Sequence, residues 1–206
     1  MRVADFVIKF LEDKGIKNVF TVSGGGSIFL CDALYKSKKL NYVSCHHEQA
    51  VSFATESYSR VKNKPGAAII TTGPGGTNCT TGVACCWIDS VPSIFISGQV
   101  YLNQTIKNTG LRQLGVQEFD IVSMVKTSTK YSVIIQTPES IKYHLEKAYY
   151  LSMEGRPGPV WVDIPANIQN AIINPKKLVG YKINKKKLIH NQITGNKNNI
   201  CYILTF

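Results

Sequence analysis

The sequence lacks the features by which secreted proteins and small zinc-binding domains are usually recognised. It contains six cysteines in 206 residues, but no two of them have Cys-x-x-Cys spacing. Its amino-terminal segment contains Asp5 and Lys9, which interrupt any apolar stretch, and no small-residue cleavage site follows. These absences argue against a zinc-ribbon or disulfide-rich secreted fold. They predict a cytoplasmic protein with reduced, mostly buried thiols.

A membrane-spanning segment is also missing. The longest uncharged run covers residues 65–88 and is long enough to cross a bilayer. However, the cluster Gly73-Pro74-Gly75-Gly76 lies inside this run and would break a spanning helix. We therefore interpret the run as buried strand, loop and helix, and we expect no association with a membrane.

Carboxylate side chains are absent after Asp163, and this accounts for most of the net charge. The totals of 24 Lys and Arg and 13 Asp and Glu give +11, but seven of the lysines fall in residues 176–206. Residues 1–175 therefore carry 17 minus 13, or +4. A lysine-rich segment without an aromatic platform is usually a solvated surface, so we expect no nucleic-acid partner. Nucleic-acid binding through this tail is the weakest alternative, and its affinity would fall steeply with salt.

What the sequence does contain is a regular alternation of helical and strand patterns. With 44% hydrophobic residues the chain can bury a core, in which we expect Trp87 and Trp161. Several predicted strands are apolar on both faces, which is typical of a parallel sheet covered by helices. The predicted strands are residues 18–22, 40–45, 67–72, 93–97, 131–135 and 160–164, and the predicted helices are residues 3–11, 28–34, 47–61, 77–87 and 138–152.

These elements predict an α/β fold, a three-layer doubly wound and mostly parallel sheet with helices on both faces. We expect one domain over residues 1–170. After it the composition shifts to Asn, Lys and Ile, which indicates a basic linker or the truncated start of a further domain over residues 171–206.

Three loops follow predicted strands at the edge where open parallel sheets bind ligands. They are residues 23–26 (Ser-Gly-Gly-Gly), residues 46–48 (His-His-Glu) and residues 71–78, which include Gly73-Pro74-Gly75. Each has an ordinary structural explanation, because glycine clusters are usually tight turns and a glutamate is favoured at a helix start. Neither glycine loop matches the dinucleotide or ATP phosphate-binding templates, and the adjacent histidines do not face one metal.

Considered together and in order, these loops resemble the N-terminal, pyrimidine-binding domain of thiamine-diphosphate enzymes. The resemblance is nearest to the large subunit of acetolactate (acetohydroxyacid) synthase and extends over about residues 1–170. Any one motif is moderately specific, whereas the ordered set is very specific. The further matching motifs are residues 87–92, 97–100, 117–122, 129–131 and 155–165.

The resemblance implies a role for each candidate site residue. Glu48 takes the place of the glutamate that contacts a ring nitrogen of the cofactor's aminopyrimidine and favours its imino form. That role needs a carboxyl in a water-poor pocket, where desolvation raises its pKa. Gln117 matches the active-site glutamine that reaches the substrate or intermediate. The implied cofactor-binding residues are Ser23, Gly24, Gly25, Glu48, Thr72, Gly73, Pro74 and Asn78.

The chain departs from the family pattern on the substrate side. Val22-Ser23 stands where the family usually has Tyr-Pro, and Val116 stands where a phenylalanine often precedes the glutamine. The aminopyrimidine side is therefore expected to be intact. The substrate side is expected to differ in shape.

One further absence concerns the diphosphate end of the cofactor. The family supplies its Mg²⁺ site from a Gly-Asp-Gly…Asn motif in a separate domain, and no Gly-Asp-Gly occurs in this sequence. We therefore predict no metal ligands in this chain and Mg²⁺ only through the absent diphosphate-binding domain, while a need for FAD is left open. The chain is then either a fragment or a protein that works as a homodimer or with a chain carrying that domain.

The predicted function is that of a thiamine-diphosphate-dependent carboligase or decarboxylase of small 2-oxo acids, a transferase or lyase. This chain would supply the pyrimidine-side half of the active site and be inactive as an isolated fragment. The alternative is a non-catalytic interaction or regulatory protein that keeps the fold and dimerises with a full-length homologue.

Overall fold

Six parallel strands form one sheet in the order β2-β1-β3-β4-β6-β5. The computed structural model describes residues 1–107 and 109–183. All six strands overlap the segments predicted from the sequence, and every pairing between them is parallel. The strands are β1 (Asn18–Thr21), β2 (Asn41–Ser44), β3 (Gly66–Ile70), β4 (Ser93–Gln99), β5 (Tyr131–Ile134) and β6 (Pro159–Pro165).

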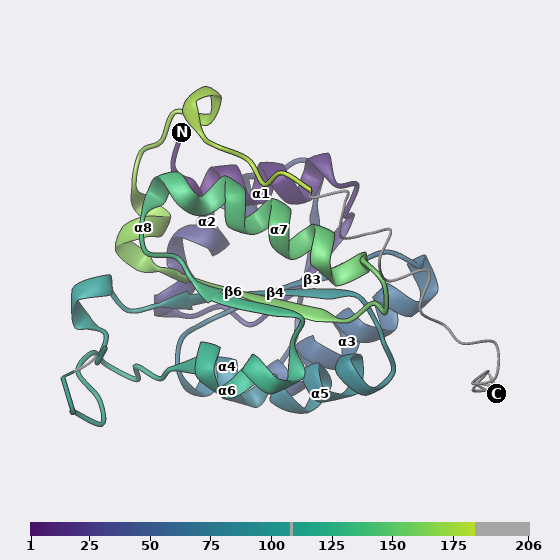
Figure 1. Cartoon of the computed structure of the whole chain (residues 1–206), viewed down its shortest axis with the longest axis horizontal. Coiled ribbons are helices and arrows are strands. Elements are labelled where there is room, and N and C mark those ends of the chain that lie inside the picture. The colour runs from purple at the N-terminus through teal and green to yellow at the C-terminus, as the bar shows by residue number, and fades with distance from the viewer. Residues whose placement is uncertain (108, 184–206) are drawn as a thin grey trace.

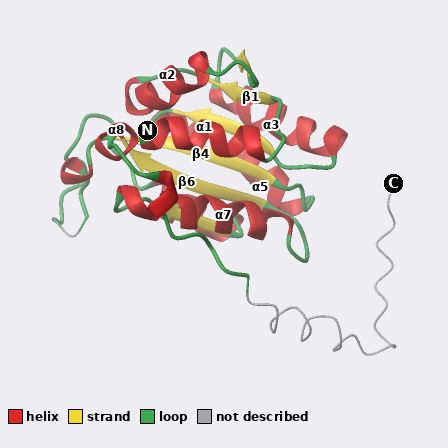
Figure 2. Ribbon diagram, turned by 90° about the horizontal axis from the view of Figure 1, so that it is seen from above, coloured by secondary structure: helices red, strands yellow, loops and turns green. Residues whose placement is uncertain are grey.

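Helices cover both faces of this sheet, which confirms the predicted three-layer α/β architecture (Figures 1 and 2). One face carries α1 (Val3–Asp13), α2 (Ile28–Lys36), α7 (Ile141–Met153) and α8 (Ala166–Asn170). The other face carries α3 (Glu48–Lys62), α4 (Pro74–Asn78), α5 (Thr80–Ile88) and α6 (Ile121–Val125). Short 3₁₀ turns complete the described elements: η1 (Gly25–Ser27), η2 (Leu102–Gln104), η3 (Lys126–Ser128), η4 (Pro138–Ser140) and η5 (Pro175–Lys177).

The central strands supply a core to each face because successive side chains of a strand point to opposite sides. In β4, Ile94 and Ile96 pack with α1, α2 and α7, whereas Phe95 packs with α3, α5 and α6. Phe95 stacks on Trp161 of β6 with ring centroids 5.4 Å apart and an angle of 10° between the ring planes. This two-sided burial is why β3, β4 and β6 read as continuous apolar runs in the sequence.

Three local predictions were wrong. Residues 74–76 are helical and not loop, because Pro74 opens α4 at the first helical position, where its missing N–H costs nothing. The predicted helix over residues 77–87 is interrupted at Cys79, where α4 ends and α5 begins. Trp161 is buried as expected, but Trp87 is 41% exposed because α5 has only solvent on its outer side.

The segment after α8 packs against the amino-terminus. The backbone N–H of Val3 donates to the carbonyl of Ala171 at 2.9 Å, and the amino-terminal nitrogen of Met1 lies 3.2 Å from the carbonyl oxygen of Ile173. Ile173 and Leu178 are both buried. The predicted boundary at residue 170 stays a prediction, and most of the expected basic linker, residues 184–206, lies outside the described residues.

Two further observations concern the described part of the chain. None of its helices combines the length and the apolar character needed to cross a bilayer. Its five cysteines are all free: Cys79 and Cys86 are buried, and the others are half-buried. Burial raises the pKa of the Cys86 thiol to about 12, which makes it a poor nucleophile.

The stack of Phe95 on Trp161 gives a test of this core. Replacing Phe95 with Ala removes a fully buried ring between β4 and α5, so we expect the free energy of unfolding to fall by about 3–5 kcal/mol. The matched control is Phe53→Ala on the outer side of α3, where the ring is 38% exposed and the loss is expected to be much smaller. Urea unfolding followed by circular dichroism measures both, and equal losses would contradict the assignment of the core.

Candidate functional site

The candidate site lies where the direction of strand order reverses. The chain leaves β1 toward β2 on one side and leaves β3 toward β4 on the other, while β1 and β3 themselves pair side by side. Such a reversal opens a crevice at the carboxyl ends of the two strands, and open α/β sheets bind ligands there. The glycine loop at Gly24 follows β1, and the glycine loop at Gly73 follows β3. The fold therefore brings two of the three predicted loops together.

Thr71 joins these two glycine loops. Its Oγ1 accepts a hydrogen bond from the backbone N–H of Gly26 at 3.1 Å. A Cβ on Gly24 would lie 2.5 Å from the Thr71 side chain, and a Cβ on Gly75 would lie 2.7 Å from Thr71 Cγ2. Gly24 and Gly75 are thus required for internal packing against one threonine. The sequence analysis gave Thr71 no role, and only its place beside the loop could have pointed to it.

Gly25 and Ser23 lie on the open side of the crevice. A Cβ on Gly25 would meet no atom within 4 Å, and both residues are exposed. This turn therefore leaves room for a ligand to approach the backbone, which is the property expected of a glycine at a cofactor site.

Glu48 begins α3 immediately after β2. The ring Nδ1 of His47 accepts a hydrogen bond from the N–H of Gln49 at 3.1 Å, which caps the helix and fixes where it starts. The amide of Asn78 donates to Glu48 Oε2 at 2.9 Å. The other oxygen, Oε1, faces Gly75, where an added Cβ would lie 3.5 Å away. One oxygen of this half-buried carboxyl is therefore held, and among the described residues no donor is bound to the other.

Gln117 contacts the Gly73 loop through its backbone. Gly73 has a φ of +57°, and a Cβ there would lie 1.9 Å from the carbonyl oxygen of Gln117. Gln117 itself has a φ of +57°, an uncommon conformation for a residue with a side chain, and its side chain is exposed at the edge of the site. The contact places the predicted substrate-facing glutamine beside the predicted cofactor loop.

Glu118 holds this segment in place, a role that the sequence analysis did not assign. Its carboxylate is buried and accepts hydrogen bonds from the backbone N–H groups of Ile106 at 2.6 Å and Leu114 at 3.1 Å. The loop before Gln117 is therefore fastened at two points along its length.

Asp163 is a second buried carboxyl at the same edge of the sheet. It is 1% exposed and accepts hydrogen bonds from Ser97 Oγ at 2.6 Å and Gln99 Nε2 at 3.1 Å. No cation pairs with it among the described residues. Burial raises its pKa to about 7, and the negative charge of Asp120 adds to the effect. Asp163 and Asp120 line a cavity of about 160 Å³ together with Glu118 and Lys107.

The remaining predicted residues fall in the same region without all touching one another. Thr72 is buried, Pro74 is exposed in the first turn of α4, and Asn78 contacts Glu48. Ser23 makes no side-chain hydrogen bond within the described chain. Three or more His, Cys, Asp or Glu side chains do not gather as metal ligands anywhere in residues 1–107 or 109–183.

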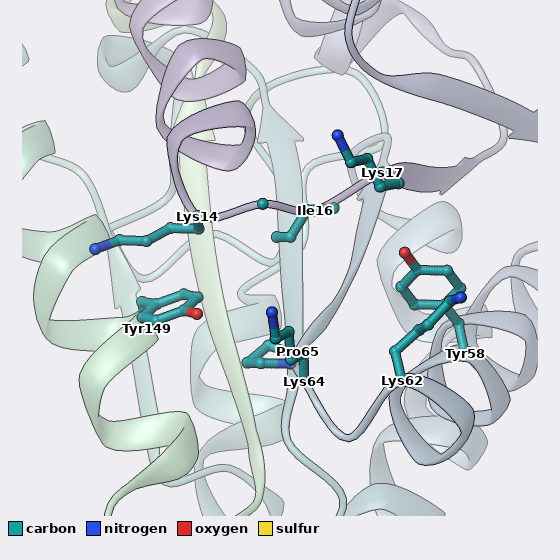
Figure 3. A pocket seen from close by; sticks show the side chains of 9 residues that line it. Lys14, Ile16, Lys17, Tyr58, Lys62, Lys64, Pro65 and Tyr149 are labelled. Carbon is teal, nitrogen blue, oxygen red and sulfur yellow. The ribbon is translucent and has the colours of Figure 1, made fainter.

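A separate cavity of about 180 Å³ lies at the opposite edge of the sheet (Figure 3). Four lysines line it, Lys14, Lys17, Lys62 and Lys64, and no carboxylate does. Helices α1 and α3 end at this edge, and the negative ends of their dipoles favour cations. The ammonium of Lys14 also lies 4.8 Å from the ring centroid of Tyr149. We attribute the lysines to these helix ends and place no site there.

Comparison with known proteins identifies the family of this chain. The family model for the thiamine pyrophosphate enzyme, N-terminal TPP binding domain, matches residues 1–124. The chain belongs to this family. The match contains the Gly24, Glu48 and Gly73 loops and ends after Gln117, so it covers every candidate site residue named from the sequence.

Its relatives include acetolactate synthases from plants and bacteria. The chloroplastic enzyme of Arabidopsis thaliana is 38% identical over 186 residues, which are 86% of this chain and 26% of that protein. The large subunit from Haemophilus influenzae is 36% identical over 167 residues, 81% of this chain and 28% of that protein. The isozyme 3 large subunit from Escherichia coli is 35% identical over 167 residues, which are again 81% of this chain and 28% of that protein. The chain spans about a quarter of the length of these relatives.

The packing of Gly73 predicts that an alanine substitution destabilises the protein more in the loop after β3 than in the loop after β1. Gly73→Ala introduces a Cβ at a positive φ and against the Gln117 carbonyl, so we expect a loss of at least about 2 kcal/mol in the free energy of unfolding. Gly25→Ala adds a methyl group to open space and is expected to change stability by less than about 1 kcal/mol. Urea unfolding curves for the two variants check this, and a larger loss for Gly25→Ala would refute it.

The raised pKa of Asp163 predicts a pH dependence of stability. The folded chain retains this proton up to about pH 7, whereas an unfolded Asp releases it near pH 4, so the native state is favoured at the acid end. Stability from this group then falls as pH rises between about 4 and 7, by up to about 1.4 kcal/mol per pH unit. The free energy of unfolding of wild type and of Asp163→Asn is measured at several pH values in this range. The difference between the two curves isolates the effect of Asp163, because His144, whose pKa is lowered by burial, contributes to both. Parallel pH curves would contradict the prediction.

Proposed function

We propose that this chain supplies the pyrimidine-side half of a thiamine-diphosphate site in an enzyme that joins or decarboxylates small 2-oxo acids. The observation that supports this most strongly is the placement of Glu48. Its carboxyl is fastened by Asn78 on one oxygen and open on the other, at the crevice between the ends of β1 and β3. Family membership and the acetolactate synthase relatives give independent support.

The residues at the crevice suit an aromatic ring with exposed nitrogen atoms. Gly25 leaves open space beside the backbone, and Gly75 keeps a side chain away from Glu48 Oε1. Ser23 offers an exposed hydroxyl on the same side. We propose that these residues, with Thr72, Gly73, Pro74 and Asn78, form the wall against which the aminopyrimidine rests.

Thiamine diphosphate, when bound, supplies the carbon nucleophile that the reaction requires. The part of this chain is to move and hold a proton. Glu48 Oε1 would hold the proton that is exchanged with a ring nitrogen of the cofactor, while Asn78 keeps the carboxyl from rotating away. A carboxyl does this best when its pKa lies near the working pH, which requires that water be excluded from it. Glu48 is half-buried in this chain, so we propose that a second protein surface completes its cover.

The other components of the site are assigned in the same proposal. Gln117 reaches toward the substrate, and the smaller Val22, Ser23 and Val116 shape that side of the pocket differently from the usual family residues. A chain that carries the diphosphate-binding domain provides the Mg²⁺ ligands, either as a second copy of a longer form or as a separate protein.

Glu48→Gln tests the proposal directly. Gln keeps the shape and can still bond to Asn78, but it cannot transfer a proton. We therefore expect turnover of a 2-oxo acid to fall by about 10²–10⁴-fold when the variant is assembled with a chain that carries the diphosphate-binding domain. The matched control is Glu139→Gln, an exposed carboxylate before α7, which is expected to retain wild-type turnover.

The same assembly separates catalysis from a purely structural partnership. If the wild-type chain pairs with its partner but neither activity nor cofactor affinity changes between wild type and Glu48→Gln, the proposal fails and the non-catalytic alternative is favoured. Calorimetry of the chain alone with thiamine diphosphate and Mg²⁺ gives a second criterion. Tight binding without another protein would exclude the half-site arrangement.

A further inference from the structure

Gln99 is a buried glutamine whose amide group forms all four of the hydrogen bonds available to it. Its Nε2 donates to Asp163 Oδ2 at 3.1 Å and to the carbonyl of Phe119 at 3.0 Å. Its Oε1 accepts from the backbone N–H of Val100 at 3.0 Å and from the hydroxyl of Thr72. The side chain is 2% exposed. A buried amide with every donor and acceptor paired has one orientation and resists displacement.

Besides the neighbouring Val100, the partners of Gln99 belong to three separate segments. Thr72 immediately precedes Gly73 in the loop after β3, whereas Phe119 lies two residues after Gln117. Gln99 stands at the end of β4, and Asp163 stands near the end of β6. One side chain therefore connects the predicted cofactor loop to the predicted substrate-facing segment, with its own position fixed by the ends of two central strands.

We propose that Gln99, oriented by Asp163, is a positioning residue that sets the placement of the Gly73 loop relative to Gln117. This rests on the proposed function, because it assigns the two connected segments to cofactor and substrate. Gln99 reaches neither ligand itself. It acts through the hydroxyl of Thr72 on one side and the carbonyl of Phe119 on the other.

Asp163 makes this arrangement directional. Its Oδ2 accepts from the amide nitrogen of Gln99, and this leaves the amide oxygen to accept from Thr72. Its Oδ1 is bound by Ser97 Oγ, which in turn accepts from the indole N–H of Trp161 at 2.8 Å. The orientation of Gln99 is therefore anchored in the hydrophobic core, and a rotated amide would place its oxygen against the carbonyl of Phe119 and its NH2 group against the N–H of Val100.

The connected segments have little tolerance for independent movement. The backbones of Gly73 and Gln117 are so close that no Cβ fits between them. Displacing one by about 1 Å would separate groups that must face one ligand, and misplacement on that scale costs on the order of 100-fold in rate. Without Gln99, the Gly73 loop would lose the Thr72 anchor and the Gln117 segment would lose the Phe119 anchor at the same time.

Amide hydrogen exchange on the complete 206-residue chain tests this connection. The N–H of Gly75, bonded to the carbonyl of Thr72, reports on the cofactor loop, and the N–H of Glu118, bonded to the carbonyl of Gly115, reports on the Gln117 segment. We expect Gln99→Met, which keeps the length of the side chain without its amide, to speed exchange at both sites by at least about tenfold. Glu139→Met, an exposed change just before α7, is the control and should alter neither site.

Variants of Thr72 distinguish positioning from a general loss of stability. Thr72→Val removes the hydroxyl at nearly constant shape and is expected to speed exchange at Gly75, whereas Thr72→Ser restores the hydroxyl and the wild-type rate. Thr72→Val combined with Gln99→Met should be no faster at Gly75 than Gln99→Met alone. The proposal is overturned if Gln99→Met changes exchange at only one of the two segments, or if it raises exchange equally at core amides such as those of β3.

Activity of the assembled enzyme separates this inference from the proposed function. Turnover that falls with Gln99→Met in parallel with loosening of both segments supports both proposals. A second outcome is faster exchange at both segments in Gln99→Met together with wild-type turnover in Glu48→Gln. That outcome supports the connection through Gln99 and rejects the cofactor role of Glu48. Full turnover in Gln99→Met, with Glu48→Gln inactive, rejects the positioning role alone.

Discussion

The site depends on the close contact between the loop that follows β1 and the loop that follows β3. These strands are neighbours, and the glycines of both loops pack against the side chain of Thr71 with no room for a Cβ at Gly24 or Gly75. Helix α4 begins in the second of these loops, and Asn78 at its end donates to the carboxylate of Glu48 at the start of α3. Because the contact is between backbones and one short side chain, it permits little variation in the distance between the loops.

The two edges of the sheet use charge in different ways. At the carboxyl edge, Glu48, Glu118 and Asp163 are each held by neutral donors, and no lysine or arginine pairs with them within the described chain. At the amino edge, lysines gather around helix ends whose dipoles favour them. A carboxyl kept apart from cations retains the capacity to exchange a proton, since a salt bridge would lower its pKa and stabilise only the charged form. The four lysines of the cavity at the amino edge thus lie at the edge opposite the proposed chemistry.

The fold, and the loops in which the candidate residues lie, could be predicted from sequence because they depend on local patterns. Buried strands such as β3 and β4 are continuous apolar runs, and the Gly24, Glu48 and Gly73 loops occur in a recognisable order. The contacts that fix the geometry could not be predicted, because they join residues distant in the sequence. Gln99 binds Asp163 across 64 positions and Thr72 across 27, and no spacing rule connects them. Trp87 was misplaced for a related reason: an apolar helix shows which side chains can be buried, whereas only the assembled layers show which side of α5 has a neighbour.

Glu48 separates two requirements of the proposed site, the orientation of its carboxyl and the exclusion of water from it. The chain determines where the carboxyl points, through His47 at the helix start and Asn78 at the tip. The chain leaves that carboxyl half-exposed, so this chain by itself does not shield its free oxygen from water. Orientation is therefore built into this fold, whereas desolvation has to come from whatever surface covers the crevice. Under the proposed function, assembly and proton transfer are linked, because the partner that supplies the diphosphate site also covers the crevice and excludes water from the Glu48 carboxyl.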